Sequence, residues 1–437
     1  MAVPKTYHLV TLGCPKNDVD SEHLERLLTG GELLPVLQPQ DADAIIVNTC
    51  GFIEQSQEQS METVRELAAA KREGQTLIVA GCMTQLYGRQ VKEETPAVDH
   101  IFGVGQWQDV ARLLSVDVDA IFDIPENNVH VAGPSAYLKI SDGCDAPCTF
   151  CVIPKIKGGL RSAPAGMLVK EAQRLVAAGA KELVLVGQDT TAWGEDLGMA
   201  VGTGLPGLLQ MLSEAVGPDV WLRLMYAYPS RVSPALIDTM AALPNVVRYL
   251  DVPLQHGSEA VLRRMKRPHN VDRVHAFVRD LRAAMPGIVL RTSFIAGFPG
   301  ETEEEFKELL DFAREIRFDH AGCFTYSRQQ WTGAFEMDAQ VPDEVKAERR
   351  DRFMRQQQKI AGKQARRFVG RTLDLLVEGT GEDEDGAPVV AGRTCREAPE
   401  VDGMVFARGT ARVGDRVPIR IEEASEYDLY GRVLSHR

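Results

Sequence analysis

The sequence predicts an α/β protein of several domains: an N-terminal domain with a parallel sheet, a central partial (β/α)6 barrel and a small C-terminal β-barrel. Three observations predict this order. Up to about residue 128, continuous apolar runs alternate with amphipathic segments. A second alternating series extends to about residue 330, and from about residue 370 short β-like runs follow one another without helices. We therefore expect domains at 1–128, 129–368 and 369–437, since 437 residues can bury several cores.

The first domain is predicted from three apolar runs, "HLVTLGC", "AIIVNTC" and "TLIVAGC", each followed by a helical pattern. Strands that are apolar throughout are buried on both faces, which is typical of a parallel sheet covered by helices. The three runs therefore indicate neighbouring parallel strands.

The central domain is predicted from six strand candidates: "YLKIS", "ELVLVG", "WLRLMYA", "YLDVPL", "IVLRTSFIAG" and "GCFTYS". Six βα units are too few to close an eight-stranded TIM barrel, so an open, partial barrel is expected. One of its helices has a capping-box signature, Thr302 followed by Glu305, and then an apolar stripe that begins at Phe306.

The C-terminal part contains a basic segment and then five short strand candidates. Residues 343–369 carry far more Lys and Arg than acids, which favours a solvated connecting helix or, alternatively, a basic edge facing RNA. The strand candidates "TLDLLVEG", "VVAGRT", "GMVFARG", "RVPIRIEEA" and "YDLYGRVL" predict a small all-β barrel.

Charge and cysteine content limit the functional class. The net charge of −13 argues against a general nucleic-acid binder. No segment approaches the roughly 18 apolar residues of a membrane span, and no export signal is evident, so we expect a cytoplasmic protein that is not bound to membranes. Eight cysteines in such a protein indicate metal or redox chemistry before disulfides.

Three of the cysteines, Cys144, Cys148 and Cys151, form a C-x3-C-x2-C motif just after the strand candidate "YLKIS". A structural zinc site needs a fourth ligand, which the local segment lacks, although a distant ligand stays open. A disulfide would leave one cysteine over. Three thiolates on a [4Fe-4S] cluster leave one iron free, and S-adenosylmethionine could chelate that iron.

This loop resembles the motif of radical S-adenosylmethionine enzymes, in which Phe150 is a typical occupant. The resemblance implies cofactor contacts from other strand ends: "LVGQDT", "VPLQHG" and "FIAGFPGE". The candidate cofactor-binding residues are Gln188, Asp189, Gln255, His256 and Gly297, with Gly300 beside the last. Lys155, Lys157 and Arg161 are candidates for holding carboxylates of the cofactor or substrate. Each of these residues could instead have an ordinary structural role in its loop.

Cys14, Cys50 and Cys82 stand at the ends of the three N-terminal apolar runs. If those strands are parallel, the three side chains emerge at the same carboxyl edge, where such sheets bind ligands. They suit a second [4Fe-4S] cluster, with an open iron that could hold a sulfur species. Cys323 and Cys395 have no partners at ligand spacing and are left out of the site.

The whole chain resembles the methylthiotransferases, which combine an N-terminal cluster domain, a radical S-adenosylmethionine domain and a C-terminal TRAM domain. By this resemblance, the two groups of three cysteines hold two [4Fe-4S] clusters. One S-adenosylmethionine would methylate a sulfur species and a second would generate the radical that activates the substrate. An electron donor and a sulfur source are therefore implied as partners, and a monomer is expected.

Within that family, the stretches "TLGCPKNDVDSE" and "EYDLYGRV" resemble those of the members that modify the β-carbon of an aspartate in a small-subunit ribosomal protein. The tRNA-modifying relatives more often carry Gln-Met after the first cysteine, where this chain has Pro15 and Lys16. Residues 371–437 contain about nine Lys and Arg against fourteen Asp and Glu, and such an acidic barrel complements a basic ribosomal protein. A tRNA (adenosine) methylthiotransferase and a non-catalytic iron–sulfur carrier are the alternatives. One departure from the family pattern is the stretch from Arg328 to Trp331, where an acidic-glycine turn is usual.

Overall fold

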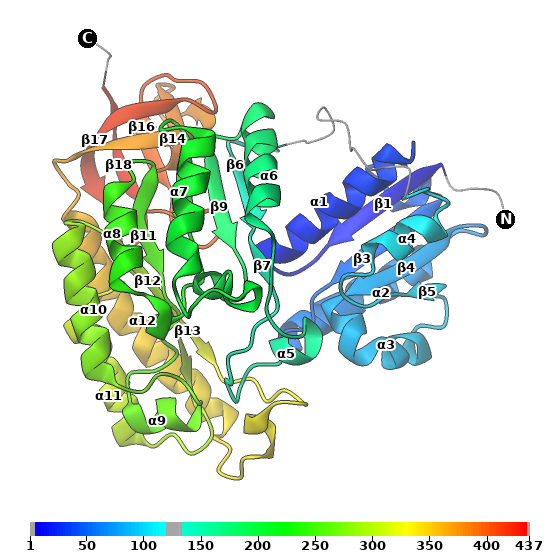
Figure 1. Cartoon of the computed structure of the whole chain (residues 1–437), viewed down its shortest axis with the longest axis horizontal. Helices are drawn as coiled ribbons and strands as arrows, with labels where there is room; N and C mark the ends of the chain where they lie inside the picture. Colours follow the sequence, from blue (N-terminus) through cyan, green and yellow to red (C-terminus); the bar gives the residue numbers. More distant parts are fainter. Residues whose placement is uncertain (1–4, 119–130, 132, 435–437) are drawn as a thin grey trace.

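The computed structural model describes residues 5–118, 131 and 133–434, and it contains three bodies that follow one another along the chain (Figure 1). An α/β domain is followed by an open sheet covered with helices and by a closed β-barrel. The predicted fold class is thus confirmed. The predicted boundary between residues 128 and 129 lies outside the described residues.

The N-terminal domain is a five-stranded, all-parallel sheet in the order β2-β1-β3-β4-β5. Its strands are β1 (Thr6–Thr11), β2 (Leu34–Pro35), β3 (Ala44–Thr49), β4 (Thr76–Gly81) and β5 (His100–Ile101). Its helices are α1 (Pro15–Gly30), α2 (Glu54–Ala70), α3 (Cys82–Glu94) and α4 (Trp107–Leu113). Every residue of β3 is buried, as its unbroken apolar sequence requires.

The central domain has six parallel strands in the order β13-β12-β11-β10-β9-β6, so the sheet is open and each strand lies beside its neighbour in sequence. The strands are β6 (Ser135–Lys139), β9 (Glu182–Val186), β10 (Trp221–Leu224), β11 (Val246–Asp251), β12 (Val289–Ala296) and β13 (His320–Thr325), with a small hairpin of β7 (Ser141–Asp142) and β8 (Arg161–Ser162).

Helices follow most of these strands. They are α5 (Ile153–Ile156), α6 (Ala165–Ala177), α7 (Gly204–Val216), α8 (Pro234–Ala242), α9 (Glu259–Arg264), α10 (Val271–Ala284) and α11 (Glu303–Ile316). Alternate strand residues such as Leu183 and Leu222 pack under the helices, while their neighbours point to the other face. The predicted capping box of Thr302 and Glu305 is present at the start of α11.

The basic segment forms α12 (Asp343–Arg366), which packs beside β12, β13 and α11 (Figure 1). Phe353 and Ala365 are fully buried. Arg349 forms an ion pair of 2.9 Å with Glu301, and Arg367 one of 2.7 Å with Asp319. The expectation of a solvated helix is therefore wrong for one face, and part of its positive charge is already paired within the protein.

The C-terminal barrel closes in the order β14-β15-β16-β18-β17, with strands β14 (Thr372–Glu382), β15 (Pro388–Arg393), β16 (Val405–Arg408), β17 (Arg416–Ala424) and β18 (Leu429–Val433). All five predicted strands are present. The barrel core is continuous with the face of the central sheet that the helices leave uncovered, since Leu375 and Ile419 belong to the same apolar cluster as Val184 and Val289. The two bodies share one core.

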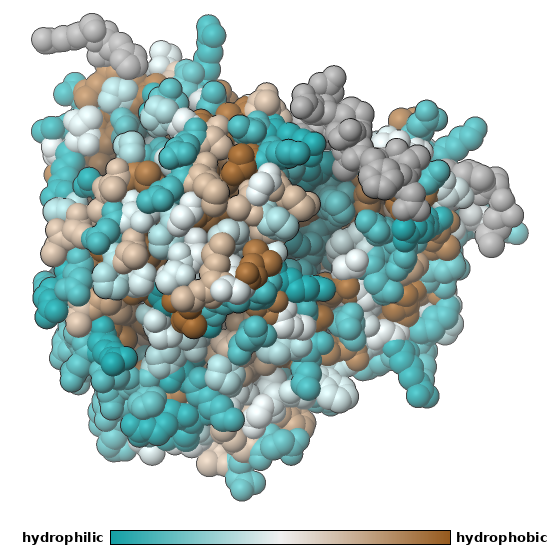
Figure 2. Space-filling model, in the orientation of Figure 1, coloured by the Kyte–Doolittle hydropathy of each residue, from teal (hydrophilic) through white to brown (hydrophobic). Residues whose placement is uncertain are grey.

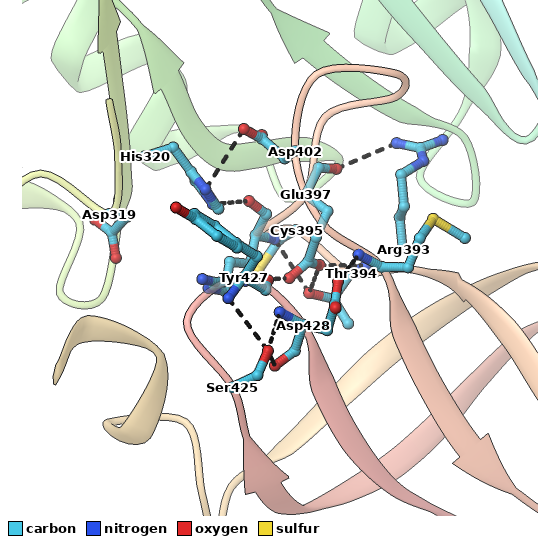
Figure 3. A network of polar contacts seen from close by, with 12 residues as sticks. Asp319, His320, Arg393, Thr394, Cys395, Glu397, Asp402, Ser425, Tyr427 and Asp428 are labelled. Carbon is cyan, nitrogen blue, oxygen red and sulfur yellow. Dashed lines mark hydrogen bonds and ion pairs between the residues drawn. The ribbon is translucent and has the colours of Figure 1, made fainter. Parts of the chain in front are cut away.

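Polar contacts from the loop between β15 and β16 complete this interface (Figure 3). Asp402 accepts a hydrogen bond of 2.7 Å from the hydroxyl of Tyr249 and lies 3.5 Å from Nδ1 of His320. Nε2 of His320 lies 3.0 Å from the carbonyl oxygen of Arg396. Complete burial lowers the pKa of His320, although the neighbouring Asp402 carboxylate acts in the opposite direction.

On the face drawn in Figure 2, hydrophobic side chains are interspersed with hydrophilic ones. Among the described helices, none has the length and apolar character needed to cross a membrane.

Candidate active site with two cysteine groups

Cys14, Cys50 and Cys82, here called the N-terminal cysteine group, lie at the carboxyl edge of three adjacent strands. Cys14 precedes α1 just beyond β1, Cys50 follows β3 directly, and Cys82 is the first residue of α3 after β4. Gly13 has φ +111° and a Cβ there would lie 2.8 Å from Cβ of Cys50, so only glycine allows this approach.

Two buried asparagines hold these loops together. Nδ2 of Asn17 donates to the carbonyl oxygens of Leu12 at 2.8 Å and Thr49 at 3.3 Å, and its Oδ1 lies 3.7 Å from Sγ of Cys82. Nδ2 of Asn48 donates to the carbonyl oxygen of Asn17. Neither asparagine was predicted from the sequence as a site residue, although Asn17 belongs to the "CPKN" stretch.

Cys144, Cys148 and Cys151, the loop cysteine group, lie beyond the carboxyl end of β6. The backbone amide of Cys151 donates to the carbonyl oxygen of Cys148. A Cβ on Gly143 would lie 2.1 Å from the carbonyl oxygen of Gly159, so the loop is tightly folded.

The end of α9 supports the loop cysteine group. The amide of Thr149 donates to the carbonyl oxygen of Met265, and NH1 of Arg267 lies 3.6 Å from Sγ of Cys148. The guanidinium of Arg267 also stacks 4.1 Å over the ring of Tyr228. Arg267 thus places a fixed positive charge beside a thiol.

One member of the N-terminal cysteine group packs across the domain boundary against the segment that carries the loop cysteine group. Cys82 packs in one buried cluster with Val152, the residue after Cys151, and with Ile156 of α5. Figure 1 shows α5 beside the end of the N-terminal domain that carries α3. Lys16 reinforces this contact, because its Nζ lies 3.5 Å from the ring centroid of Tyr226 at the end of β10.

A buried ion-pair network, here called the Lys157 latch, bridges the same boundary. Nζ of Lys157 lies 2.9 Å from Asp20 of α1 and 3.4 Å from Asp142 of β7, and Lys139 also pairs with Asp20. Burial alone would lower the pKa of Lys157, but the two carboxylates hold it above its ordinary value, so the ammonium is charged. The latch connects the helix after Cys14 to both ends of the loop cysteine group.

The chemistry of the thiols fits an iron–sulfur cluster better than a single ion. Among the described residues, no three His, Cys, Asp or Glu side chains are arranged to hold one metal ion. A cubane instead distributes three thiolates over three irons. The thiols are nevertheless close enough to interact: burial, with a contribution from the neighbouring cysteines, raises the pKa of Cys82 and of Cys151 to about 12.

Two buried polar atoms near the loop cysteine group lack hydrogen-bond partners in the described chain. Oε1 of Gln188 and the hydroxyl of Ser141 are buried, and neither has a hydrogen-bond partner in the described part of the chain. A Cβ on Gly187 would lie 2.6 Å from that hydroxyl. Unsatisfied buried groups of this kind fit a polar cofactor such as the methionine part of S-adenosylmethionine.

Asp189 already has partners within the protein. Oδ1 accepts hydrogen bonds from the hydroxyl of Thr191 at 2.6 Å and the amide of Ala192, and Oδ2 lies 3.1 Å from Arg231. Gln255 has φ +75° and bridges β11 to β12 through its backbone. Contacts of either residue with the cofactor stay a prediction.

Gly297 and His256 converge on Glu301, a residue that the sequence analysis missed. Oε2 of Glu301 accepts hydrogen bonds from the amides of Gly297 and Phe298 and lies 3.3 Å from Nε2 of His256. The close approach that Gly297 permits is to α12, since a Cβ there would lie 2.3 Å from Cγ of Lys346. Contact of Gly297 with the cofactor stays a prediction.

The three basic candidates differ in their surroundings. Lys157 is buried in the latch, whereas Lys155 and Arg161 are exposed. NH2 of Arg161 lies 3.4 Å from the carbonyl oxygen of Lys157. The structure thus leaves Lys155 and Arg161 accessible to a carboxylate from outside the chain.

Three family models match the chain. Residues 6–103 match an uncharacterized protein family, UPF0004, residues 138–313 match the radical SAM superfamily, and residues 369–434 match the TRAM domain. Both cysteine groups fall within the first two matches.

Curated relatives match over nearly the full length. The chain is 42% identical to ribosomal protein uS12 methylthiotransferase RimO of Herpetosiphon aurantiacus, over 98% of this chain and 100% of the relative. The protein of the same name from Chloroflexus aurantiacus is 43% identical over 98% and 100%, and that of an Anaeromyxobacter species is 45% identical over 100% and 94%.

Solved structures share the fold at low identity. The radical S-adenosylmethionine methyltransferase TsrM from Kitasatospora setae, with cobalamin and a [4Fe-4S] cluster bound, has a TM-score of 0.56 and 15% identity, covering 76% of this chain and 77% of that chain. The cobalamin-dependent radical enzyme OxsB has a TM-score of 0.53 and 16% identity, covering 71% and 52%.

Proposed function

The chain belongs to the family of ribosomal protein uS12 methylthiotransferases, and from this premise we propose that it transfers a methylthio group to the β-carbon of an aspartate in that ribosomal protein, using two [4Fe-4S] clusters. It is a radical S-adenosylmethionine enzyme, whose cofactors are S-adenosylmethionine and iron–sulfur clusters. The observation that carries the proposal is the packing of Cys82 against Val152, the residue that follows Cys151.

An aspartate β-carbon is not acidic, so no side-chain base could remove its hydrogen at neutral pH. When bound at the loop cysteine group, the cluster and S-adenosylmethionine supply a 5′-deoxyadenosyl radical that can take this hydrogen. In this proposal, the cluster held by the N-terminal cysteine group would bind the sulfur that is transferred. The packing of Cys82 against Val152 supports this division, because the activated carbon and the sulfur source must lie in one cavity.

The chain's own residues bind and orient in this proposal. Oε1 of Gln188 and the hydroxyl of Ser141, two buried atoms without a hydrogen-bond partner in the described chain, are proposed to hold the polar end of S-adenosylmethionine. Arg267 holds the loop beside Cys148. The Lys157 latch keeps Cys82 and the loop cysteine group in register across the domain boundary.

The substrate is proposed to dock partly on the barrel. The tip between β14 and β15 exposes Glu382, Glu384 and Asp385, which suit a basic ribosomal protein. We also propose that the enzyme acts in the cytoplasm as a monomer and receives electrons and sulfur from separate partners. A role in tRNA modification is less favoured, because Arg349 and Arg367 of the basic segment are paired with acids.

The test is an anaerobic reconstitution with iron and sulfide, followed by incubation with a reductant, S-adenosylmethionine and ribosomal protein uS12. Mass spectrometry should find one methylthio group on an aspartate of uS12. Release of 5′-deoxyadenosine with no change in the mass of uS12, but with modified adenosine in added tRNA, would contradict the proposed substrate. Intact six-cysteine protein without any 5′-deoxyadenosine would contradict the radical chemistry.

A further inference from the structure

A cavity of about 280 Å³ lies between α2 and α3 of the N-terminal domain and residues 328–335 of the central domain. These residues include the stretch from Arg328 to Trp331 that departs from the family pattern. The volume is sufficient for one or two amino-acid side chains with their backbone.

The walls of this cavity are connected to both cysteine groups. Met83, on the α3 side, directly follows Cys82. On the opposite side, the amide of Ala334 donates a hydrogen bond of 2.8 Å to the carbonyl oxygen of Thr149, which lies between Cys148 and Cys151. A ligand in the cavity would therefore touch Met83, the neighbour of Cys82, and Phe335, the neighbour of Ala334.

A hydrogen bond between side chains joins the two domains at the cavity. Nε2 of Gln57 donates to Oε1 of Gln329 at 2.9 Å and to the carbonyl oxygen of Gly51, the residue after Cys50, at 3.0 Å. Gln329 is only 5% exposed, and its own Nε2 donates to the hydroxyl of Ser327. These two amides therefore form a fixed part of the lining.

The lining is chemically suited to a polypeptide. Gln90 and Gln330 are exposed amides on opposite walls. Nε2 of Gln90 already donates a hydrogen bond of 2.7 Å to Oε1 of Glu94, and its carbonyl oxygen is an acceptor, whereas the amide of Gln330 offers both a donor and an acceptor, as a peptide backbone does. Met61 and Met83 provide adaptable apolar surface.

The charges of the lining do not suit a nucleic acid. Glu54 brings a carboxylate to the cavity. Among the described residues that line the cavity, Arg328 is the one cation, and it already donates to the carbonyl oxygen of Phe335 at 3.0 and 2.8 Å and stacks 4.5 Å over its ring. A phosphate backbone requires several available cations, which this lining lacks.

We propose that this cavity binds an extended segment of the substrate protein next to the residue that is modified, with Gln90 and Gln330 hydrogen bonding to its backbone. This inference rests on the proposed function and locates its substrate. The divergent stretch at 328–331 then helps determine which polypeptide the enzyme accepts.

The experiment compares two neighbouring residues of α3 in the reconstituted, full-length enzyme. Gln90→Trp fills the cavity, whereas Arg89→Trp adds the same bulk to an exposed side chain that does not line it. Gln330→Trp fills the cavity from the opposite wall. Binding of purified uS12 is measured by titration calorimetry, and the KM for uS12 is measured with iron content and substrate-free 5′-deoxyadenosine formation as controls.

We expect both cavity variants to weaken uS12 binding and raise its KM about tenfold or more, because backbone hydrogen bonds and space are lost. Arg89→Trp should match the wild type, and iron content and substrate-free turnover should stay unchanged in all three. The inference would be overturned if Gln90→Trp and Gln330→Trp bound uS12 with wild-type affinity. It would also be overturned if the two variants weakened the binding of tRNA but not that of uS12. Failure of the proposed function would appear separately, as a wild-type enzyme that does not modify uS12.

Discussion

Replacing Glu182 should weaken the junction between the central sheet and the barrel. Glu182 is fully buried at the start of β9, and its carboxylate lies 2.7 Å from Nε of Arg223 and 2.6 Å from NH2 of Arg393. Arg223 also donates to the carbonyl oxygens of Thr394 and Cys395, in the barrel loop that Figure 3 shows. Glu182→Gln keeps the shape but leaves two buried guanidinium groups without this negative charge.

The size of the effect follows from two arguments. Burial alone would raise the pKa of Glu182, but Arg223 and Arg393 lower it from 4.5 to about 2. At about 1.4 kcal/mol for each pKa unit, this displacement corresponds to about 3 kcal/mol of folding free energy. Removing one partner from a buried ion pair costs about 3–5 kcal/mol in other proteins. The two figures agree, so we expect a loss of about 3 kcal/mol.

The assay is urea unfolding followed by tryptophan fluorescence, since Trp221 belongs to the shared core. Glu93→Gln, which removes an exposed ion pair with Arg89, is the matched control and should change the free energy of unfolding by less than about 0.5 kcal/mol. Because the folded-state pKa of Glu182 lies below its ordinary value, its contribution is complete above pH 4.5 and is lost as the pH falls towards 2. A loss below about 1 kcal/mol at pH 7 for Glu182→Gln would refute the reasoning.

Three further predictions concern the site. Replacing all three cysteines of either group with alanine should lower the iron content from about eight to about four atoms per chain, whereas Cys323→Ala should not change it. If iron analysis found that one triple variant had lost all its iron, the two clusters would not be independent. Lys157→Met leaves Asp20 and Asp142 without this buried partner and should raise the ratio of 5′-deoxyadenosine to methylthiolated product about tenfold. Lys155→Met, at an exposed position, should not change this ratio. An unchanged ratio in Lys157→Met would contradict the role of the latch. Glu301→Gln removes the charge that holds the amides of Gly297 and Phe298, so it should raise the KM for S-adenosylmethionine about tenfold while the iron content stays intact. Glu303→Gln, which changes a partly exposed side chain, should leave this KM unchanged. Equal KM values for the two variants would exclude the positioning role of Glu301.

Much of the fold and of the cysteine arrangement could be predicted because both depend on local patterns. An apolar run such as "AIIVNTC" indicates a buried parallel strand, and the same run places Cys50 at its carboxyl end. The capping box of Thr302 and Glu305 involves residues three positions apart, so it could be read directly.

The features that were missed depend on pairs far apart in the sequence. Lys157 was a candidate for binding an external carboxylate, but Asp20, which lies in another domain, is its partner. The buried face of α12 and the contact of Arg393 with Glu182 likewise arise from tertiary packing. Neither composition nor periodicity contains this information, because it depends on how the three bodies meet.

The core shared by the sheet and the barrel also affects how a single target residue can be selected. Leu375 of the barrel and Val184 of the central sheet lie in one apolar cluster, so the barrel has a fixed position relative to the cysteines. A substrate protein seated on the barrel would present to the cysteines whichever residue lies at that separation from its seat. The distance between the docking surface on the barrel and the cysteines would then determine which residue is modified. Lengthening a barrel loop should change the modified residue while the chemistry stays the same.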